Sequence, residues 1–346
     1  MTHIGRRTFL KYGVLGAAGI AAIGAGGRWV FNRHKTMMEL RNTRLLMNTY
    51  VAMTVLTDNP EAGRAAINAA FLRMGTVAAQ LSRFEADGPV GRLNQNGILD
   101  EPPQALLDVL GRARHYAEIS GGAFDVTILP VLEYYYGLPK PIDARQLDRQ
   151  LVAKRDREVD YRALNVTQAR IAFDRPGMAI TLDGIAKGYV VDQGIEVLRR
   201  LGMGDALIDA GGDVRALSRR GARHVWTVAI MDPQNTKRAC GLVRLQNGAL
   251  ATSGNYEIFF STDRRFFHII NPHTGYSPNM YSSVTVLASR SVDADALGVT
   301  LYSLPLKRVQ EVTRDEGKEY FIVSWDGRHR WRSAHFPLYG GGARVL

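Results

Sequence analysis

The chain has only one cysteine, Cys240, among its 346 residues. A single thiol cannot form an intrachain disulfide or supply the several thiolates of a cysteine-ligated metal cluster. Cys240 also lies far from the N-terminus, which excludes a lipid-modified N-terminal cysteine. There is no internal repeat and no low-complexity tract, and 46% of the residues are hydrophobic. We therefore expect the stability of the fold to rest on a substantial apolar core.

Acidic residues are missing from the first 36 positions, which hold six Lys or Arg. The whole chain has a formal net charge of +11. Without that segment, 38 of the 44 basic residues remain against 33 acidic ones, so the net charge falls to +5. The remaining charge is scattered and forms no basic stripe interleaved with aromatic residues, so it does not indicate a nucleic-acid-binding surface.

The basic N-terminus has the order of an export signal. Arg6 and Arg7 precede the segment Phe9–Lys11, and an apolar run rich in Gly and Ala follows. This order predicts a twin-arginine signal, and hence an extracytoplasmic, periplasmic location. A signal is favoured over a membrane-spanning helix because a run so rich in Gly and Ala makes a poor membrane span. The alternative is an uncleaved membrane anchor. We expect residues 1–36 to be signal and linker and residues 37–346 to be the folded domain.

Hydrophobic patterning predicts both helices and strands in the rest of the chain. Helical spacing or capping residues indicate helices over 60–81, 103–120, 184–201 and about 293–304, and an exposed helix or connection in 140–160. Strands are expected at 45–56, within 164–180, and at 206–213, 225–230, 241–254, 265–275, 282–288 and 320–325. This order of elements predicts an α+β protein with antiparallel strand pairing.

The stretch Ile180–Gly194, with the sequence ITLDGIAKGYVVDQG, places two glycines around Lys187 where a helix is expected to begin. Two interpretations are open. The turn could bind a phosphate through backbone N–H groups and Lys187, or it could only connect a strand to a helix. The stretch lacks the glycine spacing of the P-loop and of the dinucleotide-binding fingerprint.

Other stretches place small residues beside an acid, a hydroxyl or an imidazole, and so many are hard to explain as turns alone. They are SGGAFDVTILPVLEYYYG, DAGGDVRAL, GALATSGNYE, HIINPHTG and VDADALG. In this order the motifs resemble those of the ApbE family, the FAD:protein FMN transferases, over nearly all of residues 43–325. The similar segments are Met47–Tyr50, with Asn48 in place of Gly, Ser82–Phe84 with Leu93–Asn94, Ser120–Asp125, Gly184–Tyr189, Ala210–Asp213, and His268–Gly275, with Asn271 in place of Asp.

The resemblance implies a two-lobed α+β fold with antiparallel sheets and flanking helices, with FAD bound between the lobes. Such proteins split FAD, attach FMN through its phosphate to a Thr or Ser of a target protein, and release AMP. The residues that the resemblance places at the flavin are Met47, Phe84, Ala123, Phe124, Asp125, Thr181, Lys187 and Ile270. It places Mg²⁺ at the carbonyls of Gly184 or Ala186 and at the carboxylate of Asp295, with Thr300 nearby.

Lys187 is expected to face the FAD phosphates or the ribityl chain, and His268 and Asp183 are candidates for the catalytic base. Besides Asn48 and Asn271, the chain departs from the family pattern at three further positions. Thr181 replaces an Asp, Asp183 replaces a Gly, and Val299 stands where a hydroxyl is expected in the metal motif. Thr300 is the next residue, but an offset of one residue rotates a helical side chain by about 100°.

Two functions are therefore considered. The first is an exported, Mg²⁺-dependent FMN transferase that modifies a membrane-bound redox protein. The second is a noncatalytic FAD-binding accessory or flavin donor protein for the assembly of a respiratory reductase. The partners expected are FAD and an acceptor protein with a modified Thr or Ser. Contact of the N-terminus with a membrane is also expected, and nucleic acid is not.

Overall fold

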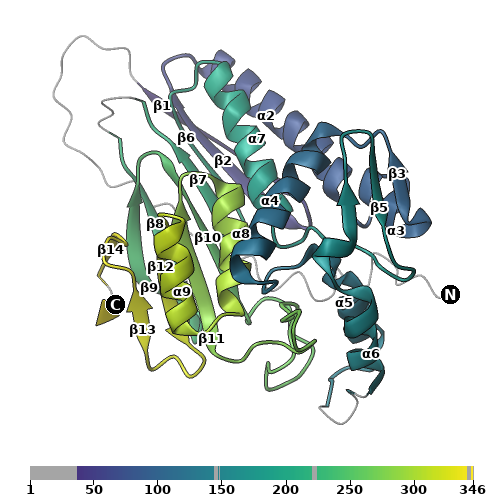
Figure 1. Cartoon of the computed structure of the whole chain (residues 1–346). Helices are drawn as coiled ribbons and strands as arrows, with labels where there is room; N and C mark the ends of the chain where they lie inside the picture. The colour runs from purple at the N-terminus through teal and green to yellow at the C-terminus, as the bar shows by residue number, and fades with distance from the viewer. Residues whose placement is uncertain (1–36, 144–146, 148, 220–223, 341–343, 346) are drawn as a thin grey trace.

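The computed structural model describes residues 37–143, 147, 149–219, 224–340 and 344–345. The predicted export signal, residues 1–36, lies outside the described residues. The chain forms two lobes, one built on a large sheet and one composed mainly of helices (Figure 1). This confirms the predicted α+β class with mostly antiparallel strand pairing.

The large sheet has nine strands in the order β1-β2-β6-β7-β10-β11-β12-β13-β15. All neighbouring pairs are antiparallel except β13 and β15. The bounds are β1 Met38–Leu46, β2 Thr49–Thr57, β6 Asp205–Ala210, β7 Asp213–Leu217, β10 Gly248–Gly254, β11 Tyr281–Ala288, β12 Glu319–Ser324, β13 Arg330–Arg332 and β15 Arg344–Val345. Two smaller sheets consist of β8 Trp226–Asp232, β9 Asn235–Leu245 and β14 Leu338–Tyr339, and of β3 Ile98–Asp100, β4 Leu164–Val166 and β5 Arg170–Phe173.

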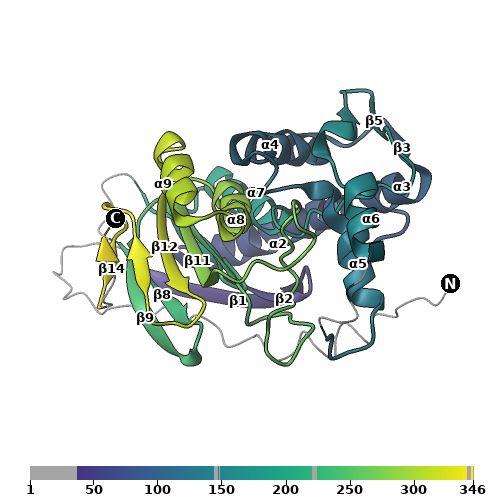
Figure 2. The ribbon, with the colours of Figure 1, turned by 60° about the horizontal axis from the view of Figure 1, so that its bottom comes forward.

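Helices cover one face of the large sheet (Figure 2). They are α2 Pro60–Leu81, α7 Ala186–Arg200, α8 Ser291–Tyr302 and α9 Leu306–Asp315. The other lobe contains α3 Pro89–Asn96, α4 Gln104–Ser120, α5 Leu129–Gly137, α6 Arg149–Glu158 and the short 3-10 helices η1 Val126–Ile128 and η3 Tyr161–Ala163. None of the helices in the described residues has the length and apolar character needed to span a membrane.

Apolar residues of the sheet alternate between two cores. In β6, Ala206 and Ile208 face the core beneath the helices, whereas Leu207 joins a second core with β8 and β9. The period of two along the strand places successive side chains on opposite faces. The large sheet is therefore buried on both faces over much of its area.

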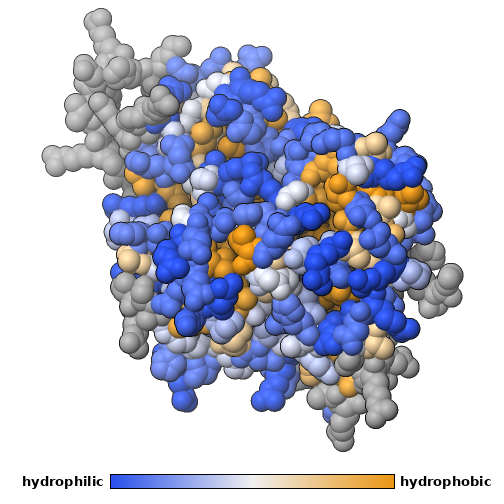
Figure 3. All heavy atoms as spheres, viewed as in Figure 1, coloured by the Kyte–Doolittle hydropathy of each residue, from blue (hydrophilic) through white to orange (hydrophobic). Residues whose placement is uncertain are grey.

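The outer surface in the view of Figure 3 is mainly hydrophilic, with hydrophobic residues in separate patches.

Helices α7 and α8 are joined by two carboxylates, one on each helix, that accept hydrogen bonds from backbone N–H groups of the other helix. The Gly188 N–H of α7 donates to the Asp295 carboxylate of α8 over 2.9 Å. In return, the Asp192 carboxylate of α7 accepts the N–H groups of Ser291 and Val292 at 2.9 and 3.1 Å. Because the first N–H groups of a helix lack partners within it, each carboxylate satisfies the start of the neighbouring helix.

The predicted helices correspond to α2, α4, α7 and α8, and α6 lies within the segment 140–160. Helix α2 shows the sequence signals clearly. The Asn59 side chain accepts the Ala62 N–H, Pro60 occupies the first turn, and residues at helical spacing such as Ile67 and Phe71 are buried. Helices α3, α5 and α9 were not predicted.

Several strand predictions need correction. The segments 206–213 and 241–254 each contain a turn, at 211–212 between β6 and β7 and at 246–247 between β9 and β10. The segment 45–56 was expected to be one strand, but Met47 and Asn48 have φ angles of 53° and 58° and form the turn between β1 and β2. Two consecutive residues with positive φ match the twist of a tight hairpin. The segment 265–275 forms no strand, and only an isolated bridge joins Phe267 to Phe259. Its apolar residues belong to a buried loop, in which the Phe267 N–H donates to the Ser277 hydroxyl.

Replacement of Gly188 should test how closely α7 and α8 must approach. A Cβ at this position would lie 2.3 Å from the carbonyl oxygen of Ser291, so the two helices would have to separate. We expect Gly188→Ala to lower the free energy of unfolding by about 1–3 kcal/mol in urea denaturation. The control is Gly75→Ala in α2, where a Cβ would meet nothing within 4 Å. That change should raise stability by up to about 1 kcal/mol, and equal effects of the two changes would contradict the packing argument.

Candidate active site at the start of helix α7

The chain enters α7 through an extended segment that a side chain holds in place. The Asn94 amide donates to the Ile180 carbonyl and accepts the Ile180 N–H, at 2.9 and 2.8 Å. The Thr181 N–H donates to the Val126 carbonyl over 2.8 Å. Residues 174–185 form no strand, so the expected strand directly before the helix is absent. The Asn94 side chain therefore pairs with both backbone groups of Ile180, as a neighbouring strand would.

Lys187 lies in the first turn of α7 and forms an ion pair with the Asp213 carboxylate. Asp213 begins β7 and its side chain is only 3% exposed, whereas the Lys187 side chain is 33% exposed. Burial by itself would lower the pKa of Lys187, but the carboxylates of Asp213, Asp295 and Glu257 raise it above its usual value. Lys187 is therefore a cation at neutral pH, with three acids around it.

Asp295 is buried beside this pair. Burial, and next the negative charge of Asp213, raise the pKa of Asp295 to about 7, while Lys187 acts in the opposite direction. Part of the Glu257 side chain is exposed to water. The protein atoms packed around the rest of it nevertheless desolvate its carboxyl group, and this raises the pKa of Glu257 as well. One lysine thus faces more negative charge than it can neutralise. This surplus of carboxylates is suited to an additional cation.

His268 is close enough to Lys187 and Asp183 to feel their charges. Its Nδ1 lies 3.1 Å from the Ile258 carbonyl oxygen. A carbonyl can only accept, so we assign the ring proton to Nδ1, and a neutral ring then leaves the lone pair of Nε2 free. Burial lowers the pKa of His268, with a smaller contribution in the same direction from Lys187, and this favours the neutral ring. The neutral imidazole has the protonation state that a general base needs.

Asp183, the other candidate base, is engaged in an ion pair. The Arg83 Nε donates to the Asp183 carboxylate over 3.0 Å. The same guanidinium lies over the Phe84 ring, 4.0 Å from its centroid. The Arg83 side chain is 9% exposed, whereas about half of Phe84 remains accessible. Arg83 therefore connects the predicted flavin-stacking residue to the segment that leads into α7.

Phe124 and Val299 meet at Gly184. A Cβ on Gly184 would lie 3.2 Å from a Val299 methyl group and 3.5 Å from the Phe124 ring. Val299 therefore faces the predicted metal-binding carbonyl segment without offering a hydroxyl. The Thr300 hydroxyl donates to the Ala296 carbonyl within α8 over 2.8 Å. This geometry does not support Thr300 as a metal ligand.

The other predicted flavin residues are only partly brought together. Met47 occupies the β1–β2 turn and is half-buried. The Asp125 carboxylate accepts from Thr127 and from the Tyr161 N–H, so it has a structural role in capping η1. Ile270 packs in a separate apolar cluster with residues of α5 and α6. Ala123 is buried next to Phe124, and the Thr181 hydroxyl accepts the Asp183 N–H.

The residues present fit a hard divalent cation. Asp295 offers a carboxylate with a raised pKa, and in the described part of the chain no donor reaches the Gly184 carbonyl. The Gly188 N–H, four residues further on, donates to Asp295 instead. The described residues contain no group of three or more His, Cys, Asp or Glu side chains placed to hold a metal. A cation would therefore depend on backbone carbonyls as well as Asp295, and oxygen ligands of this kind suit Mg²⁺.

Sequence reasoning assigned no role to Asp213, Glu257 or Arg83. Asp213 and Glu257 lie in the stretches DAGGDVRAL and GALATSGNYE, which were singled out, but no local spacing joins them to Lys187. Their proximity arises from the pairing of distant strands. Arg83 directly precedes the predicted stacking residue and lies in the similar segment Ser82–Phe84, and these were the available signals.

Comparison with known proteins gives consistent matches. The model of the ApbE family matches residues 47–322. The FAD:protein FMN transferase of Haemophilus influenzae is 31% identical over 258 residues, which are 71% of this chain and 75% of that protein. The FAD:protein FMN transferase of Treponema pallidum is 30% identical over 315 residues, or 84% of this chain and 86% of the relative. The crystal structure of the ApbE protein of Thermotoga maritima has a TM-score of 0.72 at 27% identity and covers 84% of this chain and 96% of that chain.

The ion pair of Lys187 and Asp213 should be needed for stability as well as for the site. Lys187→Ala leaves the buried Asp213 carboxylate without its cation, and we expect the free energy of unfolding to fall by about 3 kcal/mol. The double variant Lys187→Ala/Asp213→Asn removes the uncompensated charge and should be more stable than Lys187→Ala alone. Urea denaturation of both variants and of Asp213→Asn completes the cycle. A double variant no more stable than Lys187→Ala would show that the charge of Asp213 is not the cause.

Proposed function

The chain belongs to the ApbE family, and from this membership we propose that it is an exported, Mg²⁺-dependent FAD:protein FMN transferase. The observation that carries the proposal is the meeting of Lys187, Asp213 and Asp295 at the first turn of α7. Both curated relatives described above are named FAD:protein FMN transferase. The substrates would be FAD and a protein with an accessible Thr or Ser hydroxyl.

In the proposed reaction, the hydroxyl oxygen of the acceptor forms a bond to the phosphorus of the FMN half. The bond from that phosphorus to the bridging oxygen breaks, and AMP leaves with that oxygen. The hydroxyl proton passes to Nε2 of His268, which the bond from Nδ1 to Ile258 leaves free to accept it. Asp183 is less suited to this role because Arg83 holds its carboxylate.

Lys187 would neutralise part of the charge on the diphosphate. It lies at the N-terminal end of α7, where the helix dipole also favours negative charge. Binding of the diphosphate would have to compete with Asp213 for the same ammonium group. Mg²⁺, held by Asp295 and the Gly184 carbonyl, would supply further positive charge for the oxygens of the transferred phosphoryl group.

Phe84 would hold the flavin by stacking. Its ring is about half exposed, and the Arg83 guanidinium occupies one side of it. Stacking of an aromatic ring system on the exposed part of Phe84 would contribute about 1–3 kcal/mol. Phe84 belongs to the helical lobe and Lys187 to the sheet lobe, so FAD would bind between them.

We further propose that the chain acts outside the cytoplasm on a membrane-bound redox protein. The support is the Arg6–Arg7 pair followed by an apolar segment, residues that lie outside the described part of the structure. The twin-arginine pathway carries folded proteins, so cofactors could be loaded before export. The transferase and the accessory alternative both suit this route.

Transfer should depend on the charge of Asp295. We expect the purified chain, incubated with FAD, Mg²⁺ and a Thr-containing acceptor, to give covalent FMN and AMP in equal amounts. Asp295→Asn keeps an oxygen for the Gly188 N–H but loses the charge, and transfer should slow by about a hundredfold while FAD stays bound. The control is Thr300→Val, because the Thr300 hydroxyl is bonded within α8.

The readouts are in-gel flavin fluorescence of the acceptor and chromatographic quantification of AMP. Loss of activity in Thr300→Val with full activity in Asp295→Asn would contradict the assignment of the metal site. If the unmodified chain binds FAD and forms neither covalent FMN nor AMP with any acceptor, the accessory alternative is correct. Val299, which faces Gly184 without a hydroxyl, would then be the first position to change.

Export should require the arginine pair itself. Arg6→Lys together with Arg7→Lys keeps the positive charge, yet the precursor should remain in the cytoplasm because the twin-arginine pathway recognises the arginines. The measurement is immunoblotting of cytoplasmic and periplasmic fractions after expression in a bacterial host. Undiminished protein in the periplasmic fraction would show that the general secretory route exports the chain.

A further inference from the structure

Strand β1 forms one edge of the nine-stranded sheet and pairs only with β2 in the described residues. The turn at Met47–Asn48 makes Leu46 and Thr49 the closing pair of the hairpin. In a two-residue hairpin that pair is hydrogen-bonded, and bonded pairs alternate along an antiparallel ladder. The backbone groups of Arg41, Thr43 and Leu45 therefore point away from β2, toward the open edge.

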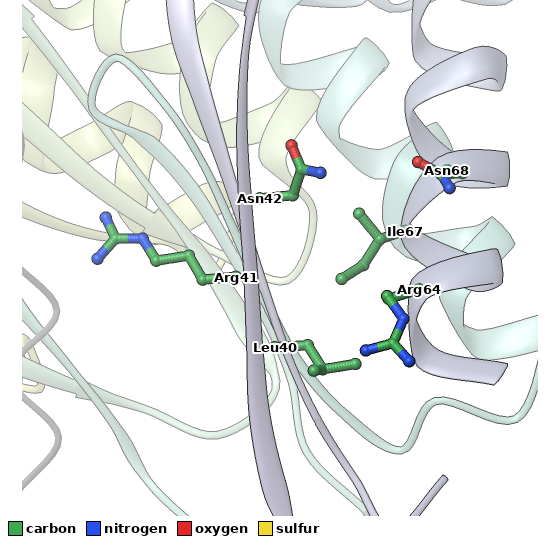
Figure 4. A pocket seen from close by; sticks show the side chains of 6 residues that line it. All are labelled: Leu40, Arg41, Asn42, Arg64, Ile67 and Asn68. Atoms are coloured by element: carbon green, nitrogen blue, oxygen red, sulfur yellow. The ribbon is translucent and has the colours of Figure 1, made fainter. Parts of the chain in front are cut away.

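The open edge adjoins a cavity of about 310 Å³ between β1 and α2. Figure 4 shows Leu40 and Ile67 between the two elements, with the polar ends of Asn42, Arg64 and Asn68 around them and Arg41 extending away. The cavity thus combines apolar side chains with a cationic and amide rim. This combination suits a side chain with an apolar stem and an acidic end, such as Glu.

The hairpin leads from this edge to the candidate active site. Leu45 and Tyr50 are direct cross-strand partners near the turn and are 62% and 58% exposed. Thr49 packs against Gly211. A Cβ added to Gly211 would lie 2.4 Å from the hydroxyl oxygen of Thr49. Two residues after Gly211, Asp213 forms the ion pair with Lys187. A strand added to β1 would therefore run alongside an exposed apolar pair toward the end of the sheet at which Lys187 pairs with Asp213, with β1, β2 and β6 between it and β7.

The charges select among the three candidate occupants of the edge. Arg41 and Arg64 line the cavity, and Arg44 lies on the same strand with its guanidinium on Asn68. The chain's own residues 1–36 have six Lys or Arg and no acid, so repulsion disfavours them. A second copy paired through β1 would set two arginines, Arg41 and Arg44, and one acid, Glu39, against the same set, so each strand would bring a net positive charge. An acidic segment of another protein has the complementary charge.

We propose that β1 is the docking edge for the acceptor protein, which adds an extended, acidic segment to the sheet and thereby directs its Thr or Ser toward Lys187. The inference rests on the proposed transferase function for the identity of this partner. Backbone hydrogen bonds from Arg41, Thr43 and Leu45 supply affinity, and the cavity beside Leu40 supplies specificity.

The test measures binding separately from transfer. The probe is a fluorescein-labelled peptide, Asp-Val-Glu-Val-Asp-Val-Thr, titrated with the full chain and followed by fluorescence anisotropy. Thr43→Pro removes an outward N–H and leaves the bonded β1–β2 pairs, so the dissociation constant should rise about tenfold. Thr43→Ala is the matched control and should bind like the unmodified chain. Retention of FAD and the urea midpoint show whether each variant is folded.

Charge reversal provides a second arm. Arg41→Glu together with Arg64→Glu should weaken binding of the acidic peptide and create binding of a matched peptide in which Lys replaces each acid. No binding of the acidic peptide, or equal binding to Thr43→Pro and Thr43→Ala, would overturn the proposal. Tighter binding to a chain that lacks residues 1–36 would identify that segment as the occupant. Sedimentation that shows a dimer broken by Thr43→Pro would identify a second copy.

The outcomes separate the docking edge from the transferase function. If FMN is transferred to a protein acceptor and Thr43→Pro leaves the Michaelis constant for that acceptor unchanged, the docking edge is wrong and the transferase function stands. If the peptide binds as expected but no acceptor receives FMN, β1 is a docking edge and the transferase function is wrong.

Discussion

The reciprocal bonds between α7 and α8 determine how Lys187 and Asp295 lie relative to each other in the candidate site. Asp192 accepts the first N–H groups of α8, and Asp295 accepts the Gly188 N–H in the first turn of α7. Gly188 allows this approach because its missing side chain leaves room for the backbone of Ser291. Asp295 and Lys187 therefore reach one region although more than a hundred residues separate them in the chain. A carboxylate that caps a neighbouring helix is in this case also the candidate metal ligand.

The same arrangement makes the site electrostatically unfavourable without a ligand. Asp213, Asp295 and Glu257 surround one lysine, and the raised pKa of Asp295, about 7, reflects that excess of negative charge. Buried charges of this kind are retained in proteins mainly where function needs them. Binding of a cation would stabilise the ionised form of Asp295, so the free energy lost in folding the site would be recovered on ligand binding.

The sequence predicted helix α2 well because its apolar periodicity and its Asn59 cap are local. The β1–β2 turn was missed because Asn48 is the only usual turn residue in this apolar run, and Met47, which also has a positive φ, gave no turn signal. The loop at 265–275 was predicted as a strand because burial of residues such as Phe267 has the same hydrophobic signature in a loop as in a sheet. Lys187 and Asp295 were placed at the site by resemblance. Their contacts with Asp213 and Gly188 depend on tertiary packing, which no local pattern contains.

The departures from the family pattern have different structural consequences. Asp183, the displaced acid, is held by Arg83 on the side of Phe84, so its charge is partly neutralised where the flavin is expected. Val299 places a methyl group beside Gly184, where a hydroxyl would have added an oxygen. The first change thus affects the flavin side of the site and the second the metal side. The metal side is left with the Asp295 carboxylate and backbone carbonyls as candidate oxygen ligands, so the loss of a hydroxyl at Val299 makes that side depend more on Asp295.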